Sequence, residues 1–491
     1  MDNCRFRAII RSLFNSGIAY NARFRIAVRA SERIESNANP LGAQHMILRN
    51  ATVGQLLVDS AHRTPDKPAL CYGERCVTYG ELDRITDEYA LDDGRLAFIA
   101  NASSDRKAPE VVDIIIKYLA AMKRGKIAVF GDRLDYDLSN TDLTDAESIL
   151  FTSGVTGKPK AVLATHYARV NSAAAHVEAL GATADDNFIV AIPLHHCFSL
   201  TANLVSAITV GATLCIPDDR HSKSLLECIE RDRCTIFNAV PTIFYALIRG
   251  DLLNSYDYST LRTGFIGGAS YTPEFFREVN DGLQFNLIPG LGQTEGTAAY
   301  TFLPWTASLT DRSETLGRFM EHIQVKLTDR GEICIKGFVV CNALGEPTPL
   351  DGWLHTGDLG QIGSDGLLRF KGRLKEIIIR GGENIMPIEI EEAIRAAFPN
   401  IGELAVTGTP DERFGEEILV VIATNTIDAQ SSPEAPILDF TTPESIRDAE
   451  TTIRDALALR LPKHKVPRYI RFVDELPKTA AGKIALSALN P

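Results

Sequence analysis

No apolar run in this 491-residue sequence approaches the roughly 20 residues that a membrane-spanning helix needs. An excess of positive charge is missing too, since 51 Lys and Arg stand against 63 Asp and Glu, for a formal net charge of −12. Proteins that bind nucleic acid usually present a basic face. We therefore expect neither a transmembrane segment nor a nucleic-acid partner, although a local basic funnel for nucleotide phosphates is compatible with this balance.

The cysteines follow no recognisable pattern. The nine cysteines are odd in number, scattered along the chain and free of C-x-x-C spacing. We therefore expect neither a disulfide scaffold nor a zinc site. The pattern favours reduced, buried thiols in a cytoplasmic protein.

At 491 residues the chain is too long for one ordinary core, because typical domains hold roughly 100–200 residues. Two or three structural units are therefore expected. The composition, with 45% apolar and 23% charged residues, is that of a globular protein. It argues against an intrinsically disordered chain and against a collagen-like repeat.

Residues 1–48 differ from the rest, because the arginines between Arg5 and Arg33 outnumber the acidic residues. An Arg-rich, acid-poor segment is typical of mitochondrial targeting, and a membrane-surface amphipathic helix is a second interpretation. Asp2, Glu32 and Glu35 weaken the targeting pattern. We favour a basic, helical N-terminal extension that packs on the main body.

Beyond Thr52 the sequence alternates helical and strand-like patterns. Val111–Met122 is apolar at helical spacing. Short apolar runs predict strands at Ile127–Phe130, Phe188–Ile192, Thr213–Ile216, Thr235–Ala239 and Thr263–Ile266. Such alternation favours α/β layers with much parallel sheet.

After Glu314 the pattern becomes strand-rich. Further strands are predicted at Gln324–Thr328, Glu332–Ile335 and Leu367–Phe370. A new unit begins near residues 372–380, with helices at Pro387–Ala397 and Pro443–Arg460, strands around Ala405–Val406 and Ile418–Ala423, and a polar loop at Asp428–Pro436.

The segment from Phe151 to Lys160 has the composition of a triphosphate-binding loop. Its glycines, Gly154 and Gly157, allow a tight turn and a close approach of backbone N–H groups to an anion. Three hydroxyls and two lysines add hydrogen bonds and positive charge. It is not a Walker A loop, because the glycine spacing is shorter and a proline follows Lys158. A polar surface loop is the simpler alternative.

Two further glycine-containing segments carry acids. In Gly290–Glu295, the terminal carboxylate suits a Mg²⁺ ion that also touches phosphate oxygens. In Gly352–Asp358, an acid at the end of a Gly-rich turn could accept two hydroxyl donors, as a ribose offers; a turn capped by Asp is the alternative.

The last two segments lie towards the C-terminus. Gly381 and Gly382 suggest a flexible turn between a strand and a helix, and the helix is expected to begin near Pro387, since Pro is favoured in the first helical turn. Lys483 stands in a Gly-containing loop and could present a compact charge to a phosphate or a carboxylate. Taken alone, a solvated lysine is the simpler interpretation.

In this order and at these spacings, the five segments resemble the adenylate-forming superfamily, which contains acyl- and aryl-CoA synthetases, luciferases and the adenylation domains of peptide synthetases. The resemblance covers roughly Thr52 to Ile484 and is closest to acyl- or aryl-CoA ligases. Further matching segments are Thr78–Leu82, Pro193–His196, Val240–Thr242, Gly267–Ala269 and Lys465–Arg468.

The resemblance implies an α/β fold in two domains. A large multi-layer N-terminal domain with mixed sheets and a β-rich subdomain would span residues 49–374. A small α+β C-terminal lid domain would span residues 375–491.

The resemblance also implies roles for individual residues. The phosphate loop would comprise Thr152, Ser153, Gly154, Thr156, Gly157, Lys158 and Lys160. Gly268, Ala269 and Ser270 would line the adenine, Thr294 would contact the α-phosphate, and Asp358 and Arg373 would bind the ribose. Gly292 would also belong to the nucleotide-binding residues. Glu295, together with Thr152, would hold Mg²⁺.

The implied reaction is that of an AMP-forming acid–thiol ligase. ATP would activate a small carboxylic acid as an acyl-adenylate with release of pyrophosphate, and coenzyme A would accept the acyl group. Lys483 would bridge the substrate carboxylate and the α-phosphate, and His196 would border the acyl pocket. Rotation of the lid about Lys375 would then bring Gly381 and Gly382 beside a thiol tunnel.

Several positions depart from the family pattern. Val155 stands where relatives carry a hydroxyl for phosphate, and Leu291 stands where they carry an aromatic ring that stacks on adenine. The other departures are Ala161, Pro289 and Leu486. From Tyr79 to Thr152 the distance is 152 − 79 = 73 residues, where relatives have well over a hundred. We therefore expect a shortened N-terminal part, and hypothesise that residues 1–48 fill the gap.

Three other functions stay open. The segment Leu194–Phe198 contains no acid that could pair with an amino-acid ammonium, which favours a simple carboxylate substrate. The acceptor could instead be the phosphopantetheine of a carrier protein. A non-catalytic nucleotide-binding relative and a kinase-like ATPase are the lesser alternatives, and monomer and homodimer are both compatible with the sequence.

Overall fold

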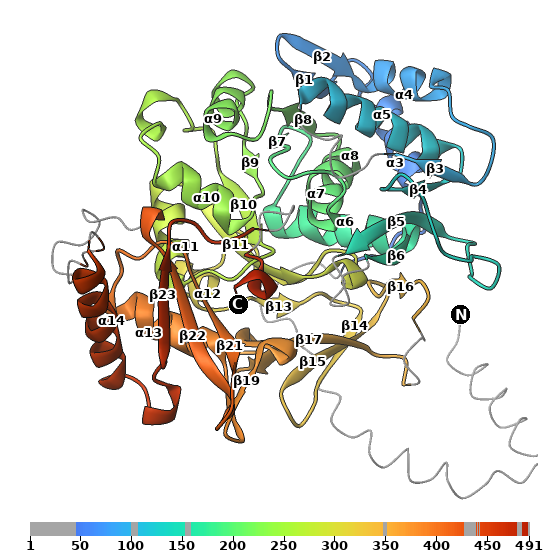
Figure 1. Ribbon diagram of the computed structural model, residues 1–491. Helices are drawn as coiled ribbons and strands as arrows, with labels where there is room; N and C mark the ends of the chain where they lie inside the picture. Colours follow the sequence, from blue (N-terminus) through green and yellow to red (C-terminus); the bar gives the residue numbers. More distant parts are fainter. Residues whose placement is uncertain are drawn as a thin grey trace, which may run out of the picture. The chain divides into compact units, whose positions relative to one another are not determined.

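The computed structural model describes residues 46–99, 107–152, 159–346, 351–426, 438, 440, 442–478 and 484–489 (Figure 1). Four β-sheets lie within these ranges. Within the same ranges, no helix is both long and apolar enough to cross a bilayer. Residues 1–45 of the basic N-terminal extension and the polar loop at 428–436 lie outside the described residues.

The largest sheet has nine strands in the order β13-β12-β11-β10-β9-β7-β8-β1-β2. Its members are β1 (Pro68–Tyr72), β2 (Arg75–Thr78), β7 (Asn187–Ile189), β8 (Thr213–Ile216), β9 (Ile236–Phe237), β10 (Thr263–Gly267), β11 (Asn286–Gly292), β12 (Ala299–Phe302) and β13 (Arg318–Phe319). The strands from β11 to β1 pair in parallel, while β2, β12 and β13 pair antiparallel.

Helices cover both faces of this sheet, because its central strands are apolar on both sides. Ile189 and Phe237 pack with α9 (Ser222–Arg231), α10 (Pro241–Ile248) and α11 (Pro273–Gly282). On the other face, Phe188 and Leu214 pack with α3 (Val53–Arg63), α5 (Ala108–Lys123), α6 (His166–Leu180) and α8 (Ser206–Val210). Burial on both faces is the pattern of a doubly covered parallel sheet.

A five-stranded sheet has the order β16-β6-β5-β4-β3. It comprises β3 (Leu96–Phe98), β4 (Ile127–Val129), β5 (Ala146–Thr152), β6 (Lys160–Thr165) and β16 (Asn342–Ala343).

The helix that precedes this sheet in the chain, α4 (Tyr79–Glu88), begins with a capping box. In it the Thr78 hydroxyl accepts from the Glu81 amide and the Glu81 carboxylate accepts from the Thr78 amide. This explains why Thr and Glu stand three residues apart there.

The third sheet is antiparallel, with the order β14-β15-β17-β18. Its strands are β14 (Ile323–Leu327), β15 (Glu332–Gly337), β17 (Leu354–Ile362) and β18 (Leu368–Arg373). The expectation that Asp358 ends a Gly-rich turn was wrong, because Asp358 lies inside β17. Gly357 has φ +72°, and the register of the strand shifts between Leu359 and Gly360. The glycines that suggested a turn are therefore part of an irregular strand.

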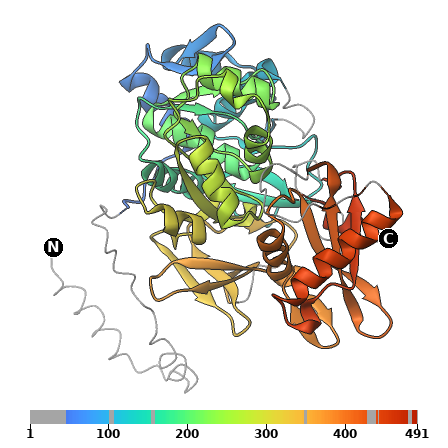
Figure 2. The same ribbon diagram turned by 90° about the vertical axis from the view of Figure 1, so that its left-hand side faces the viewer.

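The fourth sheet follows the short helix η4 (Leu374–Glu376). It contains β19 (Ile378–Arg380), β20 (Glu383–Ile385), β21 (Leu404–Asp411), β22 (Gly415–Ala423) and β23 (Tyr469–Val473). Helices α13 (Pro387–Ala397) and α14 (Pro443–Ala458) bury Ile390 and Ile453 against one face. Figure 2 shows α14, in red, lying along this sheet.

Short elements complete the description. They are α7 (Cys197–Ser199), the π-helix η1 (Leu200–Val205), η2 (Leu253–Ser255), η3 (Thr294–Gly296), α12 (Leu309–Glu314), η5 (Thr424–Thr426), η6 (Lys463–Lys465) and η7 (Leu486–Ala488).

The α/β fold with mixed sheets and a β-rich part is as predicted, and α13 has the predicted bounds. The strand predicted at Thr235–Ala239 is shorter, since β9 holds only Ile236–Phe237.

The expectation of reduced thiols throughout was wrong at one pair. Cys71 and Cys76 form a disulfide across the β1–β2 hairpin, where the antiparallel register places them directly opposite each other. The other six described cysteines are free thiols: Cys197, Cys215, Cys228, Cys234, Cys334 and Cys341.

Candidate functional site

The predicted phosphate loop joins two antiparallel strands. β5 ends at Thr152 and β6 begins at Lys160, and these two residues lie opposite each other in the ladder. Lys160 Nζ lies 3.0 Å from Glu346 Oε1, with both side chains partly exposed. The remaining predicted loop residues lie outside the described residues: Ser153, Gly154, Thr156, Gly157 and Lys158.

The predicted adenine-binding residues follow the carboxyl end of a parallel strand. β10 ends at Gly267, which lies opposite Gly290 of β11, so Gly268 and Gly292 leave the same edge of the sheet. A Cβ at Gly267 would come within 2.8 Å of the Gly290 carbonyl oxygen. Gly268 has φ +86°, and the exposed backbone continues through Ala269 and Ser270. Ligands of open α/β sheets commonly bind at this edge.

Thr294 and Glu295 lie in the one-turn helix η3, which connects β11 to β12. The preceding glycines, Gly290 and Gly292, belong to β11. Gly292 is required there, because a Cβ would lie 1.9 Å from the Ala298 carbonyl oxygen.

Thr297, which ends this turn, has φ +69° and ψ −45°. A β-branched residue rarely adopts positive φ, and such strain persists only where surrounding contacts impose it. The Thr297 hydroxyl donates to the Val339 carbonyl at 2.6 Å, and the Cys341 amide donates to the Glu295 carbonyl at 2.8 Å. The segment 339–341 thus fixes one side of the turn.

A buried arginine fixes the other side. Arg169 of α6 has no exposed surface, and its Nη1 donates to the Thr297 carbonyl at 3.1 Å and to the Thr201 hydroxyl at 2.6 Å. Its Nε lies 3.2 Å from Glu147 Oε2, and Glu147 is equally buried and accepts from the Tyr118 hydroxyl. Buried charges are tolerated only when they are paired and hydrogen-bonded in this way.

A histidine on the same helix supports the following strand. His176 lies seven residues after Arg169, so both side chains leave the same face of α6. Its Nε2 donates to the Ala299 carbonyl of β12 at 3.0 Å. Burial lowers the pKa of His176 to about 4, so the ring is neutral at pH 7. Sequence reasoning missed both supporting residues, since neither belongs to a motif.

His196, the predicted acyl-pocket residue, is next in the chain to Cys197, which contacts the Thr294 turn. His196 precedes α7, and the Thr294 hydroxyl lies 3.5 Å from Cys197 Sγ. The ring centroids of His195 and His196 are 4.3 Å apart. The π-helix η1 follows directly, and π-helices frequently occur at functional sites. The fold therefore places His196, which is predicted to border the acyl pocket, close in space to Thr294, which is predicted to contact the α-phosphate.

Asp358 and Arg373, predicted to bind ribose, lie opposite each other on β17 and β18. Arg373 Nε is 3.0 Å from Asp358 Oδ1; the carboxylate side chain is 4% exposed and the arginine side chain 38%. Gln293 Nε2 donates to the Thr356 carbonyl at 3.4 Å. The predicted ribose-binding pair therefore lies near the turn that carries Thr294.

The remaining predicted residues lie after β18. Lys375 is exposed in η4, directly after Arg373. Gly381 and Gly382, with φ +59° and +91°, form the exposed tip of the β19–β20 hairpin. The expectation of a strand-to-helix turn was therefore wrong, because β20 intervenes before α13. Lys483 lies outside the described residues.

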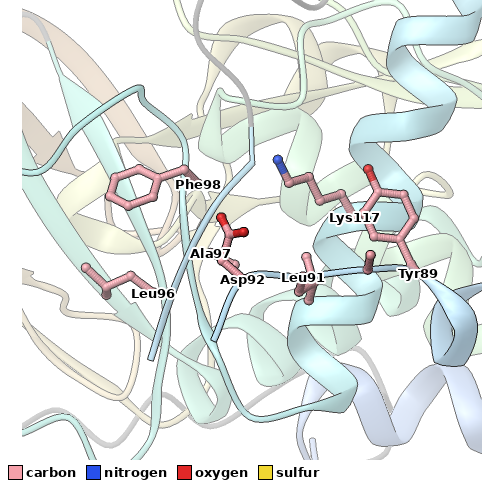
Figure 3. Close-up of a pocket in the computed structure, with 8 residues that line it drawn as sticks. Tyr89, Leu91, Asp92, Leu96, Ala97, Phe98 and Lys117 are labelled. Carbon is pink, nitrogen blue, oxygen red and sulfur yellow. The ribbon is translucent and has the colours of Figure 1, made fainter. Parts of the chain in front are cut away.

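A cavity of about 170 Å³ opens at a different place, beside the edge strand β3 (Figure 3). It is lined by Tyr89, Ala90, Leu91, Asp92, Leu96, Ala97, Phe98 and Lys117. Figure 3 shows Lys117 reaching in from α5 and Asp92 from the segment after α4. None of the predicted site residues lines it.

The strand ends, the one-turn helix and the Asp358–Arg373 pair together have the arrangement expected of a nucleotide-binding α/β protein. The family model described as AMP-binding enzyme matches residues 93–343, and the model of the AMP-binding enzyme C-terminal domain matches residues 389–483. This chain therefore belongs to the AMP-binding enzyme family, as the resemblance predicted.

Curated relatives share this family. A human protein named medium-chain acyl-CoA ligase, mitochondrial, is 31% identical over 382 residues, which cover 72% of this chain and 58% of the relative. An acyl-CoA ligase of Aspergillus fumigatus is 31% identical over 370 residues, covering 70% and 60%. The matched part thus spans less than two thirds of the length of these relatives.

A solved structure of an anthranilate CoA ligase in complex with anthranoyl-AMP has a TM-score of 0.74 and 21% identity, covering 89% of this chain and 96% of that one. The o-succinylbenzoate CoA synthetase of Bacillus subtilis, solved with an acyl-adenylate, gives a TM-score of 0.69 at 21% identity, covering 88% and 97%. These similarities show a common fold.

Proposed function

We propose that the protein activates a carboxylic acid with ATP as an acyl-adenylate, releases pyrophosphate, and transfers the acyl group to the thiol of coenzyme A. One observation carries most weight: the buried Asp358 carboxylate, paired with Arg373, lies near the strained turn that holds Thr294 and Glu295. A ribose acceptor and an α-phosphate donor at neighbouring positions suit the AMP half of an acyl-adenylate.

The nucleotide would be held largely by preformed groups. The backbone from Gly268 to Ser270 is exposed and has no bulky side chain, which suits the flat face of adenine. Asp358 is fixed by Arg373, so it can accept ribose hydroxyls without reorganising. The Thr294 hydroxyl would contact the α-phosphate, beside the acyl pocket bordered by His196.

The site suits Mg²⁺, because Glu295 is partly exposed at the turn and Mg²⁺ commonly takes one or two carboxylates plus phosphate oxygens. Glu295 would hold the ion with the Thr152 hydroxyl, and the bound ion would neutralise charge on the phosphates. Lys483 would place a second positive charge between the substrate carboxylate and the α-phosphate.

The second half-reaction would use a different arrangement of residues 375–491. A turn about the exposed Lys375 would withdraw Lys483 and bring the Gly381–Gly382 tip towards the adenylate. Gating of this kind protects reactive intermediates from water. The carrier-protein alternative shares every adenylation residue and differs only in the thiol.

The decisive experiment separates the two half-reactions. Carboxylate-dependent exchange of pyrophosphate into ATP measures adenylation, and thioester formation from a supplied acyl-adenylate measures transfer. Lys483→Ala should lower the first by about 10²–10³-fold, the range seen when one transition-state donor is removed, and largely spare the second. Lys478→Ala is the matched control, because Lys478 pairs with Glu403 at 2.7 Å. Equal loss of both half-reactions in Lys483→Ala would contradict the two-state lid.

Product analysis tests the reaction class. AMP and pyrophosphate are expected, whereas ADP would indicate a kinase-like ATPase, and no exchange with any acid would indicate a non-catalytic relative. A panel of carboxylic acids assayed by pyrophosphate release would identify the acyl substrate. Steady-state rates with coenzyme A and with a phosphopantetheinyl carrier protein would then identify the acceptor.

We also propose a cytoplasmic protein, because six of the eight described cysteines are free thiols. Fractionation of expressing cells tests this, and recovery in an organelle fraction would contradict it.

A further inference from the structure

Three potential metal ligands converge on one face of the sheet formed by β14, β15, β17 and β18. Glu332 and Cys334 are alternate residues of β15, so their side chains leave the same face. His355 of β17 lies opposite Cys334 in the antiparallel ladder. His355 Nδ1 lies 3.0 Å from Glu332 Oε2 and 3.4 Å from Cys334 Sγ.

We propose that Glu332, Cys334 and His355 form a zinc-binding site, which no motif in the sequence indicated. In the described part of the chain, this is the one group of three such side chains whose ligand atoms all lie within 4.8 Å of one another. The proposal does not depend on the reaction proposed above.

The separations suit a tetrahedral ion. Zinc bonds of about 2.0–2.3 Å place nitrogen and oxygen ligands about 3.4 Å apart, and nitrogen and sulfur ligands about 3.6 Å apart. The imidazole–carboxylate and imidazole–thiol separations are already within a few tenths of an ångström of these values. Small side-chain rotations would therefore admit the ion without moving either strand.

The donor set selects the metal. A thiolate and an imidazole favour zinc over the oxygen-seeking Mg²⁺ and Ca²⁺. Three protein ligands leave the fourth position to water or another small ligand. Because the His355 side chain is 45% exposed while Cys334 is buried, the ion would enter from the solvent side of the imidazole.

Neighbouring groups are placed as outer-shell partners of such an ion. Asp351 Oδ2 lies 3.6 Å from His355 Nε2, the nitrogen that faces away from the proposed ion, and zinc-binding histidines usually donate this N–H to a carboxylate. Glu332 Oε1 accepts from the Gly357 amide at 3.2 Å, which leaves Oε2 for the ion.

The adjacent lysine does not occupy the site. Lys326 lies opposite Cys334 on β14, but its ammonium lies 3.0 Å from Asp351 Oδ2 and 4.6 Å from the centroid of the Trp353 ring. Hydrogen bonds alone satisfy the imidazole and the carboxylate, whereas the thiol makes only long contacts, 3.4 Å to His355 Nδ1 and 3.9 Å to the Glu332 carbonyl. A metal ion would give all three groups a strong partner.

Zinc would join β15 to the start of β17, three residues before Asp358. The ion would therefore restrain the strand that carries the predicted ribose acceptor. A structural site of this kind would lower the mobility of that strand without touching the nucleotide.

The test uses the full-length, tag-free protein after treatment with a chelator. Zinc is titrated in competition with a chromophoric chelator, and cobalt is added separately, because a Co²⁺–thiolate bond gives a charge-transfer band in the near ultraviolet. One zinc per chain and one cobalt–thiolate band are expected. Absence of the band in the wild-type protein would overturn the proposal.

Variants identify the ligands. Cys334→Ser should abolish the cobalt–thiolate band, and His355→Ala should weaken zinc binding beyond the roughly 10–100-fold loss expected for the outer-shell change Asp351→Asn. His221→Ala is the matched control, because His221 lies 3.0 Å from Asp219 but is not part of the three-ligand group, and it should bind zinc unchanged. Circular dichroism checks folding. Unchanged zinc affinity in folded His355→Ala would place the ion elsewhere and refute the site.

Discussion

Two turns of this molecule carry predicted functional groups but are built in opposite ways. The turn at Thr294–Gly296 is fixed from one side by segment 339–341 and from the other by the buried Arg169. The hairpin tip at Gly381–Gly382 is exposed, and the Gly381 amide donates a hydrogen bond of 2.8 Å to the Phe414 carbonyl.

This difference corresponds to the tasks that we propose for them. A residue that positions a metal ion and a phosphate must keep its geometry, so its backbone strain is imposed by buried contacts. A segment that moves between two half-reactions must be easy to reorganise, and paired glycines with positive φ provide that freedom. The contrast between the supported turn at Thr294–Gly296 and the glycine tip at Gly381–Gly382 leads to testable predictions.

The largest effect is expected for Arg169→Met. Removing one partner of a buried ion pair leaves Glu147 uncompensated, so the free energy of unfolding should fall by about 3–5 kcal/mol. Urea unfolding measures this loss. The double variant Arg169→Met/Glu147→Leu should recover part of it, and a double variant as unstable as the sum of both single changes would contradict a coupled pair.

Glu295→Gln should slow adenylation by about 10²–10³-fold, because a carboxylate at the rigid turn would hold Mg²⁺ where charge develops. The Mg²⁺ concentration for half-maximal exchange should rise as well. Pyrophosphate exchange at several Mg²⁺ concentrations measures both quantities. Glu274→Gln, on the exposed first turn of α11, is the control and should change neither. An unchanged Mg²⁺ dependence in Glu295→Gln would argue against the metal role.

Acid should weaken the supported turn through His176. Its pKa is about 4 in the folded protein against an ordinary value of 6.5, so between these values the unfolded chain binds the extra proton. The stabilisation is complete above pH 6.5 and is lost as the pH falls towards 4, by up to about 3 kcal/mol.

Urea unfolding at pH 7.5 and pH 5 measures this loss for the wild-type protein and for His176→Gln. The variant keeps an amide donor for the Ala299 carbonyl but cannot titrate. An equal pH dependence in both proteins would show that another group is responsible.

The smallest effect is expected for Gly382→Ala. No atom lies within 4 Å of the added Cβ, so only the φ of +91° is unfavourable, at a cost of about 1–2 kcal/mol local to the hairpin. Thioester formation should slow while pyrophosphate exchange is unchanged. Gly73→Ala, at φ +53° in the β1–β2 turn and equally open, is the control and should affect neither half-reaction. A loss of exchange in Gly382→Ala would contradict the division of tasks between the two turns.

The sequence was most informative where local chemistry dictates structure. Pro387 at the first helical position indicated where α13 begins, and the predicted range Pro387–Ala397 matches the helix. The hydroxyl and acid of the capping box were visible in Thr78–Leu82, although their structural role became clear only from the hydrogen bonds of the folded chain.

The contacts that complete the site could not be predicted in this way, because they depend on register and on tertiary packing. Asp358 and Arg373 meet because β17 and β18 pair with a shift, and Arg169 reaches Thr297 across 128 residues. Likewise, the three proposed zinc ligands come from two strands, so no local spacing such as C-x-x-C could indicate them.

Helix α6 makes two contacts with the segment behind η3, seven residues apart. Each residue turns an α-helix by 100°, so seven residues return the side chain to nearly the same direction. A single-residue insertion between Arg169 and His176 would therefore swing one of the two side chains away from the segment while leaving the helix intact. The two contacts together therefore fix the number of residues between these two positions.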